Sequence, residues 1–374
     1  MKRADYKDNN IQAFFELLRA GLWEKEARLS QYNEIDYAAI MRLAEEQSVV
    51  GVITAGLEHV ADVKVPKEDL LQFVGSSLQI EQQNKAMNSF VAKLIERLRA
   101  AEVYSLLVKG QGIAQCYERP LWRSSGDVDL LLSDTNYMKA KEVLLPLAAE
   151  VEPEFGSLKH LEMTMKGGFV VELHGLLHSR LSKRVDRVID EAQRDVFFGG
   201  SVRSWQNDGT TVFLPSPDND VIFVFTHILK HFYIEGIGLR QICDWCRLLW
   251  TYRGSLNRRL LESRIKKAGL MTEWKAFGSF AVDYLGMPEE AMPFYDSRYK
   301  GKSSRILEFV LECGNFGHNR EFNRSKNLII GKLQALWFKM HDFTRHARIF
   351  PLDSLRFFVH YLVDGVGVAF RVNR

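Results

Sequence analysis

Two aspartates in the segment Ser125-Gly-Asp-Val-Asp-Leu-Leu-Leu132 have the residue type and spacing expected of metal ligands. Asp127 and Asp129 are separated by one residue, so a β-strand places both carboxylates on the same face. Carboxylates held that close repel each other and need a cation, a proton or solvent nearby. Magnesium bound by paired carboxylates and substrate phosphates is a common solution. The simpler explanation of an isolated Asp-x-Asp is a solvent-facing strand end.

A third acid follows on a predicted β-hairpin. Residues 162–166 and 169–174 alternate as strands do, and Gly167-Gly168 between them suits a two-residue turn. Glu172 lies on the second of these strands, with His174 at the same parity. We expect Glu172 to approach the aspartate pair across the sheet.

A glycine turn precedes the aspartates and is a candidate phosphate site. Residues 104–109 read as a buried strand, Gly110-Gln-Gly112 as a tight turn and residues 113–117 as a short helix. Backbone N–H groups at such a helix start attract anions such as a triphosphate, and Lys109 and Arg123 add positive charge. Turn geometry alone also explains a Gly-x-Gly.

The remaining pattern is helical on both sides of this segment. Apolar residues recur three or four apart from Asn10 to about Val103, Asp36 is a plausible N-cap, and residues 67–99 read as one long helix or a pair. Ser133 is the expected N-cap of a helix reaching about Ala149.

The fold class expected from these elements is α+β. It consists of a mixed sheet with helices, including a possible strand at 211–214, flanked by helical regions at both ends of the chain. Ser216-Pro217 begins the last helical region. We therefore expect an N-terminal helical region at 1–101, an αβ core at 102–215 and a C-terminal helical region at 216–374.

Taken in order, these residues resemble the polymerase-beta type nucleotidyltransferase superfamily, whose signature is a glycine at a helix start, then Asp-x-Asp, then a third acid. Leu107-Val-Lys-Gly110, Tyr117, Arg123, the Asp127-Val-Asp-Leu-Leu run and Val171-Glu-Leu-His174 resemble the bacterial family of uncharacterised nucleotidyltransferases more specifically. The resemblance extends loosely into the flanking helical regions.

The resemblance implies a nucleotidyltransferase-like fold and transfer of a nucleoside monophosphate from a triphosphate, ATP among them, to a hydroxyl acceptor on a small molecule or protein. Asp127, Asp129 and Glu172 would be the catalytic residues and ligands of Mg²⁺ or Mn²⁺, with Glu172 alternatively accepting the acceptor's proton. Lys109, Gly110, Gln111 and Arg123 would bind the nucleotide, and His174 would support Glu172.

A second hypothesis is a catalytically inactive module on the same fold that binds nucleotide or a protein partner. Gln111 stands where the superfamily prefers Gly or Ser, and the spacing from Gly110 to Asp127 is longer than in its compact members. A third hypothesis is a helical interaction protein with an incidental Asp-x-Asp.

Composition places the chain among ordinary globular proteins. Its 374 residues are 46% hydrophobic, and 50 Lys plus Arg against 47 Asp plus Glu leave a formal charge of only +3. That balance argues against wholesale electrostatic capture of nucleic acid.

We see no secretory signal and no stretch suited to a membrane span, so a cytoplasmic location is the default. The basic tracts Arg258-Arg259 and Lys266-Lys267 read as solvated helix faces.

Four possible zinc ligands lie within a short segment. Cys243 and Cys246 form a C-x-x-C, and His227 and His231 are one helical turn apart. Both pairs lie in helical patterns with apolar neighbours, so ordinary helix packing is the favoured interpretation over structural zinc.

Overall fold

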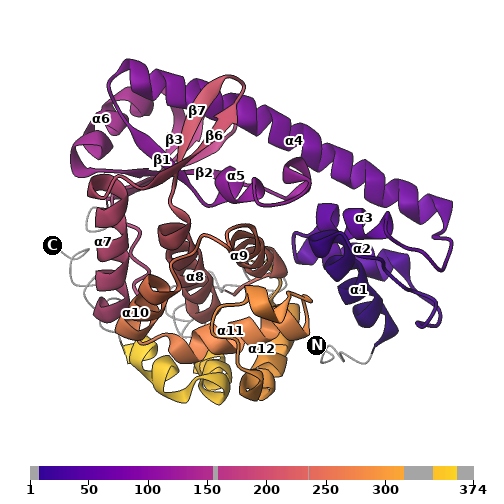
Figure 1. Cartoon of the computed structure of the whole chain (residues 1–374). Helices are drawn as coiled ribbons and strands as arrows, with labels where there is room; N and C mark the ends of the chain where they lie inside the picture. The colour runs from indigo at the N-terminus through magenta and orange to yellow at the C-terminus, as the bar shows by residue number, and fades with distance from the viewer. Residues whose placement is uncertain (1–7, 155–158, 235, 316–339, 360–374) are drawn as a thin grey trace, which may run out of the picture.

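The computed structural model describes residues 8–154, 159–234, 236–315 and 340–359. The helices expected in the N-terminal region are found between residues 9 and 100. The Asp36 side chain accepts a hydrogen bond from Ala39 N at 2.9 Å and caps the second helix. The fourth is a single long helix that runs from the N-terminal helices to the sheet (Figure 1). These helices are α1 (Asn9–Trp23), α2 (Tyr37–Glu46), α3 (Val50–Leu57) and α4 (Lys67–Ala100).

A five-stranded mixed sheet follows, with the strand order β1-β2-β5-β4-β3. Only the β2–β5 pair is parallel; the other three neighbouring pairs are antiparallel. The β4–β5 pair is the expected hairpin turning at Gly167-Gly168. The strands are β1 (Ser105–Val108), β2 (Asp127–Leu132), β3 (Ala148–Val151), β4 (His160–Met165) and β5 (Val170–His174).

Two of the predicted helices have different bounds. The helix after β2 is α6 (Asp134–Leu144), and a 3-10 turn at Leu145–Leu147 ends it before Ala149. Pro146 explains the early end, because its ring clashes with the preceding helical turn, and residues 148–151 form strand β3 instead. The helix after β1 is α5 (Gly110–Ala114), so Gly110 starts a helix directly rather than a separate turn.

The two faces of the sheet differ in chemistry. Alternate residues of its strands, including Val128, Leu130 and Leu173, are buried against apolar side chains of α4 and α6. The opposite face carries Asp127, Asp129 and the other polar residues of that parity. The period of two therefore gives the sheet one largely apolar face. On the other face, here called the polar face, the acids lie beside buried apolar residues such as Leu106 and Leu131.

The rest of the described chain is a hairpin followed by helices. The hairpin of β6 (Val202–Asn207) and β7 (Thr210–Pro215) packs beside β1, and β7 contains the expected strand at 211–214. Pro217 begins the next helix as predicted. Residues 340–349 and 351–359 are also helical. The helices are α7 (Lys183–Phe198), α8 (Pro217–Ile234), α9 (Leu239–Thr251), α10 (Arg258–Ala268), α11 (Met271–Asp283) and α12 (Lys300–Cys313).

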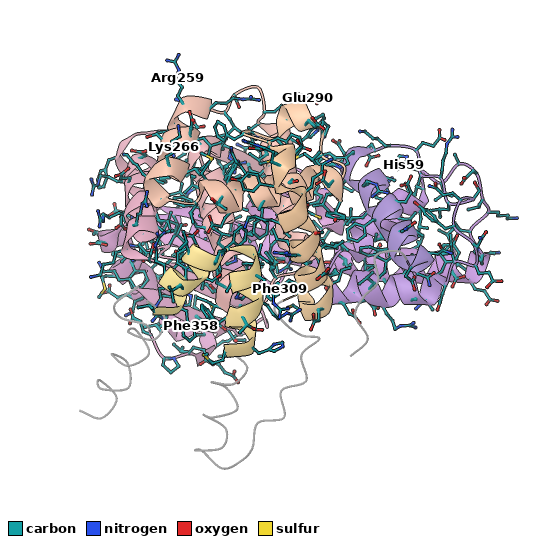
Figure 2. All side chains as sticks on the ribbon, turned by 90° about the horizontal axis from the view of Figure 1, so that it is seen from below. His59, Arg259, Lys266, Glu290, Phe309 and Phe358 are labelled. Atoms are coloured by element: carbon teal, nitrogen blue, oxygen red, sulfur yellow. The ribbon has the colours of Figure 1, made fainter. Side chains whose placement is uncertain are left out.

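The exposed surface of α10 carries the basic tracts noted in the sequence. Arg259 and Lys266 are exposed, and Figure 2 shows both at the outside of the molecule. They form a solvated helix face, as the pattern indicated.

A membrane-spanning helix is not found within the described ranges, where every helix is too short or too polar.

Candidate active site

Neighbouring strands bring the three predicted acids together. In the parallel pair of β2 and β5, Asp129 lies directly beside Glu172. One carboxylate oxygen from each of Asp127, Asp129 and Glu172 lies within 4.8 Å of the others. Asp129 is buried, with 1% of its surface exposed, while the other two are half-buried. The acids thus converge on the polar face of the sheet with a spacing that suits divalent cations.

Two basic side chains lie against the buried aspartate. Lys109, which follows β1, places its Nζ 2.7 Å from Asp129 Oδ1. His174, two residues beyond Glu172, places its Nε2 2.7 Å from Asp129 Oδ1 and 3.2 Å from Glu172 Oε2. His174 therefore contacts Asp129 as well as the residue that it was expected to support.

The site holds more negative charge than these contacts neutralise. The pKa of Asp127 is raised to about 6, first by the charge of Asp129 and then by burial. Burial alone would raise the pKa of Glu172. Hydrogen bonds from His160 and His174, together with the charge of Lys109, outweigh burial and lower the pKa below its usual value. A further cation near Asp127 would relieve the remaining repulsion.

The backbone that precedes the site has an unusual conformation. Lys109 has φ 57° and ψ −146°, and Gly110 has φ 34°. A positive φ is costly for lysine, so the surrounding structure must hold this conformation. The bend carries the chain from β1 directly into α5 with the lysine side chain directed at Asp129. A residue with a Cβ at Gly110 would be strained as well as close to Asp127 O, at 3.3 Å.

Gln111 is part of a buried polar network rather than of the pocket surface. Its Nε2 donates to Asn84 Oδ1 of α4 at 3.0 Å, and its Oε1 accepts from Ser125 Oγ at 3.2 Å. Asn84 Nδ2 in turn donates to the carbonyls of Leu121 and Arg123 at 2.7 and 2.8 Å. This network fixes the loop that leads into β2.

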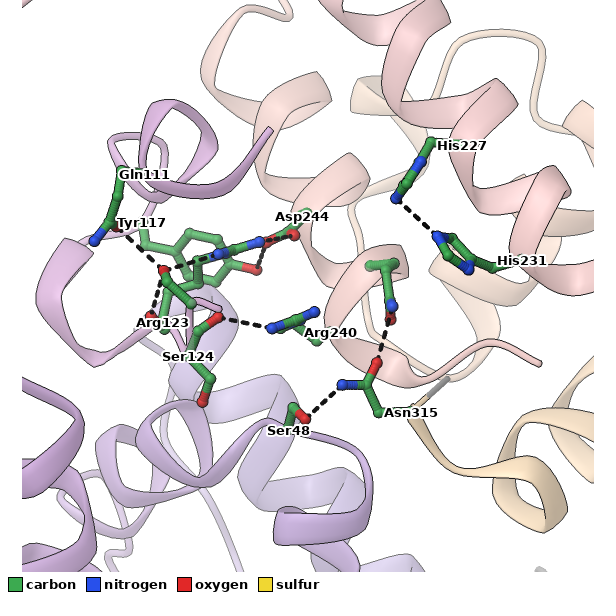
Figure 3. Close-up of polar contacts among 12 residues, drawn as sticks. Ser48, Gln111, Tyr117, Arg123, Ser124, His227, His231, Arg240, Asp244 and Asn315 are labelled. Atoms are coloured by element: carbon green, nitrogen blue, oxygen red, sulfur yellow. Dashed lines mark hydrogen bonds and ion pairs between the residues drawn. The ribbon is translucent and has the colours of Figure 1, made fainter. Parts of the chain in front are cut away.

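Arg123 forms a buried ion pair with Asp244 of α9. Its Nε and Nη2 donate to the two carboxylate oxygens at 3.0 and 2.6 Å, and its Nη1 donates to Ser125 Oγ (Figure 3). Tyr117 donates to the same carboxylate at 2.8 Å. These donors are engaged within the protein and Asp244 balances the charge of Arg123, so Arg123 acts on the site chiefly through the loop that it anchors.

A pocket open to solvent adjoins Asp127 and Asp129. On one side it is lined by the strand ends and α5, and on the other by α8 and α9. Arg240 of α9 lies in its wall and donates from Nη1 to Ser124 O at 3.1 Å (Figure 3). The lining residues include Lys109, Gly110, Arg123, Asp127, Asp129, His227, Arg240, Gln241 and Asp244.

The cysteines and histidines of the possible zinc motif do not gather around one point. Cys243 and Cys246 are buried in the helical core, and burial raises the pKa of both thiols. His227 and His231 contact each other, with 2.9 Å between their Nε2 atoms. Within the described ranges, neither pair belongs to a group of three converging ligand atoms.

Sequence reasoning missed three residues near the site. His160 lies opposite His174 because β4 begins two residues earlier than expected. His160 lies two residues before Glu162, so the period of a strand places both side chains on the same face; this was the available signal in the sequence. Arg240 and Asp244 lie on α9, far along the chain, and no local pattern connects them with the aspartates.

The sheet and the three acids define an α+β fold of the nucleotidyltransferase class, and comparison with known families agrees. The model of the family described as uncharacterised nucleotidyltransferase matches residues 33–286. The chain therefore belongs to this family, and nucleotidyl transfer is the reaction class that membership supports.

Other comparisons add little. A crystal structure of an antigenic nucleotidyltransferase-like protein from Paracoccidioides brasiliensis aligns with 17% identity over 54% of this chain and 92% of that one, with a TM-score of 0.32. No curated protein matches the chain.

Proposed function

We propose that the protein is a divalent-metal-dependent nucleotidyltransferase that moves a nucleoside monophosphate from a nucleoside triphosphate to a hydroxyl acceptor. The observation that carries the proposal is the convergence of Asp127, Asp129 and Glu172 beside a pocket. An all-oxygen donor set suits Mg²⁺ or Mn²⁺, and the raised pKa of Asp127 marks a position where positive charge is lacking. When bound, the ion would neutralise phosphate charge and align the triphosphate.

In this proposal the chain's own groups bind and orient the triphosphate. Lys109 lies beside Asp129 and lines the pocket, so its ammonium can contact a phosphate oxygen while still paired. Gly110 supplies the start of α5 without a side chain in the way. Arg240 adds positive charge on the α9 side, whereas the charge of Arg123 is balanced by Asp244. Gln111 keeps the loop 120–126 in place.

Glu172 suits charge stabilisation better than proton transfer. Its lowered pKa makes its carboxylate a weak base near neutral pH. We therefore assign Glu172 to the metal-binding set rather than to deprotonation of the acceptor.

The acceptor would occupy the part of the pocket bounded by α8. Val224 and Ile228 provide apolar surface there, and His227 lies between them on the same helix. A mixed apolar and polar wall suits a small molecule or a single side chain.

The test is Mg²⁺-dependent triphosphate binding and transfer of label from an α-labelled triphosphate in cell extract. We expect binding to require Mg²⁺ and Asp129→Ala to reduce label transfer by about a hundredfold or more. Because Asp129 is buried, Asp127→Asn serves as a second variant, and Glu150→Gln on exposed β3 is the matched control. Acid precipitation separates labelled protein from labelled small molecules. Tight binding that needs no metal and survives both substitutions would refute the proposal.

A nucleotide-binding module without turnover is the second candidate. The observation that favours it is the contact between Lys109 Nζ and Asp129 Oδ1, because an ammonium there supplies charge that a metal would otherwise bring. Mg²⁺-independent binding of triphosphate with no pyrophosphate release would support this candidate. Pyrophosphate release that is lost in Asp127→Asn would exclude it.

A further inference from the structure

The polar face of the sheet continues beyond the three carboxylates to a pair of histidines. His160 on β4 and His174 on β5 are directly opposite each other in the antiparallel register. Their ring centroids are 4.8 Å apart and their planes are tilted by 34°. One ring nitrogen from each histidine and one oxygen of Glu172 lie within 4.8 Å of one another.

Both imidazoles approach the same carboxylate oxygen. His160 Nε2 is 3.1 Å and His174 Nε2 is 3.2 Å from Glu172 Oε2. The three side chains project from paired strands, so the backbone register fixes their spacing. Side-chain exposure is 24% for His160, 19% for Glu172 and 9% for His174, so an ion can reach the group from solvent.

The donor set differs from that of the neighbouring acids. Asp127, Asp129 and Glu172 offer oxygen alone, which suits Mg²⁺. Two imidazole nitrogens and one carboxylate oxygen suit borderline ions such as Zn²⁺ or Co²⁺, and three protein ligands leave further positions open. In the absence of an ion, His160 hydrogen-bonds to Glu172 at 3.1 Å and His174 to Asp129 at 2.7 Å, so binding an ion would replace these two contacts.

We propose that His160, His174 and Glu172 form a second metal site, selective for a borderline transition-metal ion, that shares Glu172 with the carboxylate site. The inference deepens the proposed function, since the shared carboxylate would connect this ion to the nucleotide site. Ion binding itself does not depend on nucleotidyl transfer.

The experiment titrates full-length, chelator-treated protein with Co²⁺ in excess Mg²⁺, which favours Mg²⁺ at the all-oxygen site. A strong rise in visible d–d absorption above that of aqueous Co²⁺ reports transfer of the ion to a protein site of lower coordination number, and competition with a chromophoric chelator gives the Zn²⁺ affinity. We expect one equivalent of Co²⁺ to produce the absorption. His160→Ala should remove the absorption and weaken Zn²⁺ binding at least about tenfold.

His178→Ala is the matched control, because His178 is a half-buried histidine paired with Asp190 away from the sheet. It should leave the absorption intact. His160→Gln and circular dichroism provide a second variant and a check of folding. An unchanged spectrum in folded His160→Ala and His160→Gln, or no Co²⁺ absorption in the unaltered protein, would overturn the inference.

The two proposals can fail separately. If the protein binds Co²⁺ through His160 but shows no Mg²⁺-dependent triphosphate binding, the second metal site stands and the proposed function fails. If triphosphate binding requires Mg²⁺ while Co²⁺ absorption is absent, the proposed function stands and this inference fails.

Discussion

At the scale of single residues, the clearest electrostatic cost on the polar face of the sheet is ionisation of Asp127. It shares one side of β2 with Asp129, and its charged form is disfavoured first by that neighbour and then by burial. Lys109 and His174 both contact Asp129 instead. Asp127 is therefore the residue through which added positive charge would stabilise the site most.

We predict that Asp127→Asn stabilises the metal-free protein at neutral pH. The pKa of Asp127 is raised from 3.8 to about 6, so ionising it costs the folded state roughly 2 to 3 kcal/mol. Because the folded pKa of this acid is raised, the cost is absent below about pH 4 and complete above about pH 6. Thermal unfolding in chelator should show the variant more stable at pH 8 and nearly equal to the unaltered protein at pH 4.

Glu150→Gln on β3 removes a carboxylate from the same sheet at an exposed position and should change stability little at either pH. Equal destabilisation of Asp127→Asn at both pH values would contradict the assignment of repulsion to this site. Asp127→Asn should also abolish the gain in stability that Mg²⁺ with triphosphate gives the unaltered protein, because a ligand that binds only the folded state stabilises that state.

At the scale of elements, the loop 120–126 is held between two helices. Asn84 of α4 binds two of its carbonyls, while Asp244 of α9 binds the Arg123 side chain. Both ion-pair partners have only 7% of their side-chain surface exposed. The position of β2, and of its aspartates, thus depends on helices from either side of the sheet.

A double-mutant cycle should show that Arg123 and Asp244 are strongly coupled. Arg123→Met leaves a buried carboxylate without its main partner, and breaking such a pair costs about 3 to 5 kcal/mol. Asp244→Asn in the same chain removes that charge while keeping an acceptor for Tyr117. We expect the double variant to be more stable than Arg123→Met alone, measured by urea unfolding.

The exposed pair of Arg28 and Glu26 provides the comparison for this cycle, with 71% and 54% of their side-chain surfaces exposed. Arg28→Met should cost less than about 1 kcal/mol. Strictly additive effects of Arg123→Met and Asp244→Asn would show that the buried pair does not act as a unit.

At the scale of the whole molecule, one side chain joins the three regions predicted from sequence. Arg247 of α9 donates to Leu22 O of α1 and to Cys116 O after α5, both at 2.7 Å. Its guanidinium also lies over the rings of Trp23 and Tyr117. The largest apolar cluster likewise contains residues from α1, α5 and α9. The boundaries at 101 and 215 remain a proposal. We expect the three regions that they separate to unfold together rather than as independent domains.

Arg247→Ala should therefore destabilise the protein as a whole. Arg247 is 3% exposed, and its loss removes a donor from Leu22 O and from Cys116 O, which keeps only the longer bond from Thr251 Oγ1; an unsatisfied buried carbonyl costs about 1 to 3 kcal/mol. Tryptophan fluorescence and far-UV circular dichroism should shift together in urea. Arg253→Ala, an exposed arginine just beyond the same helix, is the control. A shift in one probe alone would indicate that the N-terminal helices unfold separately.

Much of the fold was predictable because its signals are local. Strand period placed Asp127 and Asp129 on one face, Gly167-Gly168 marked the hairpin, and Asp36 marked a helix start. The misplaced end of α6 shows the limit of periodicity, since its apolar spacing continued past the proline that ends the helix.

The sequence by itself determined the residue types, their strand parity and hence which carboxylates could share a face, because side-chain direction along a strand depends only on the local backbone. Tertiary structure alone decided that Asp244 holds Arg123 and that α8 and α9 form one wall of the pocket. Those contacts join residues far apart in the chain, and their partners are selected by packing of the whole molecule, which no local pattern encodes.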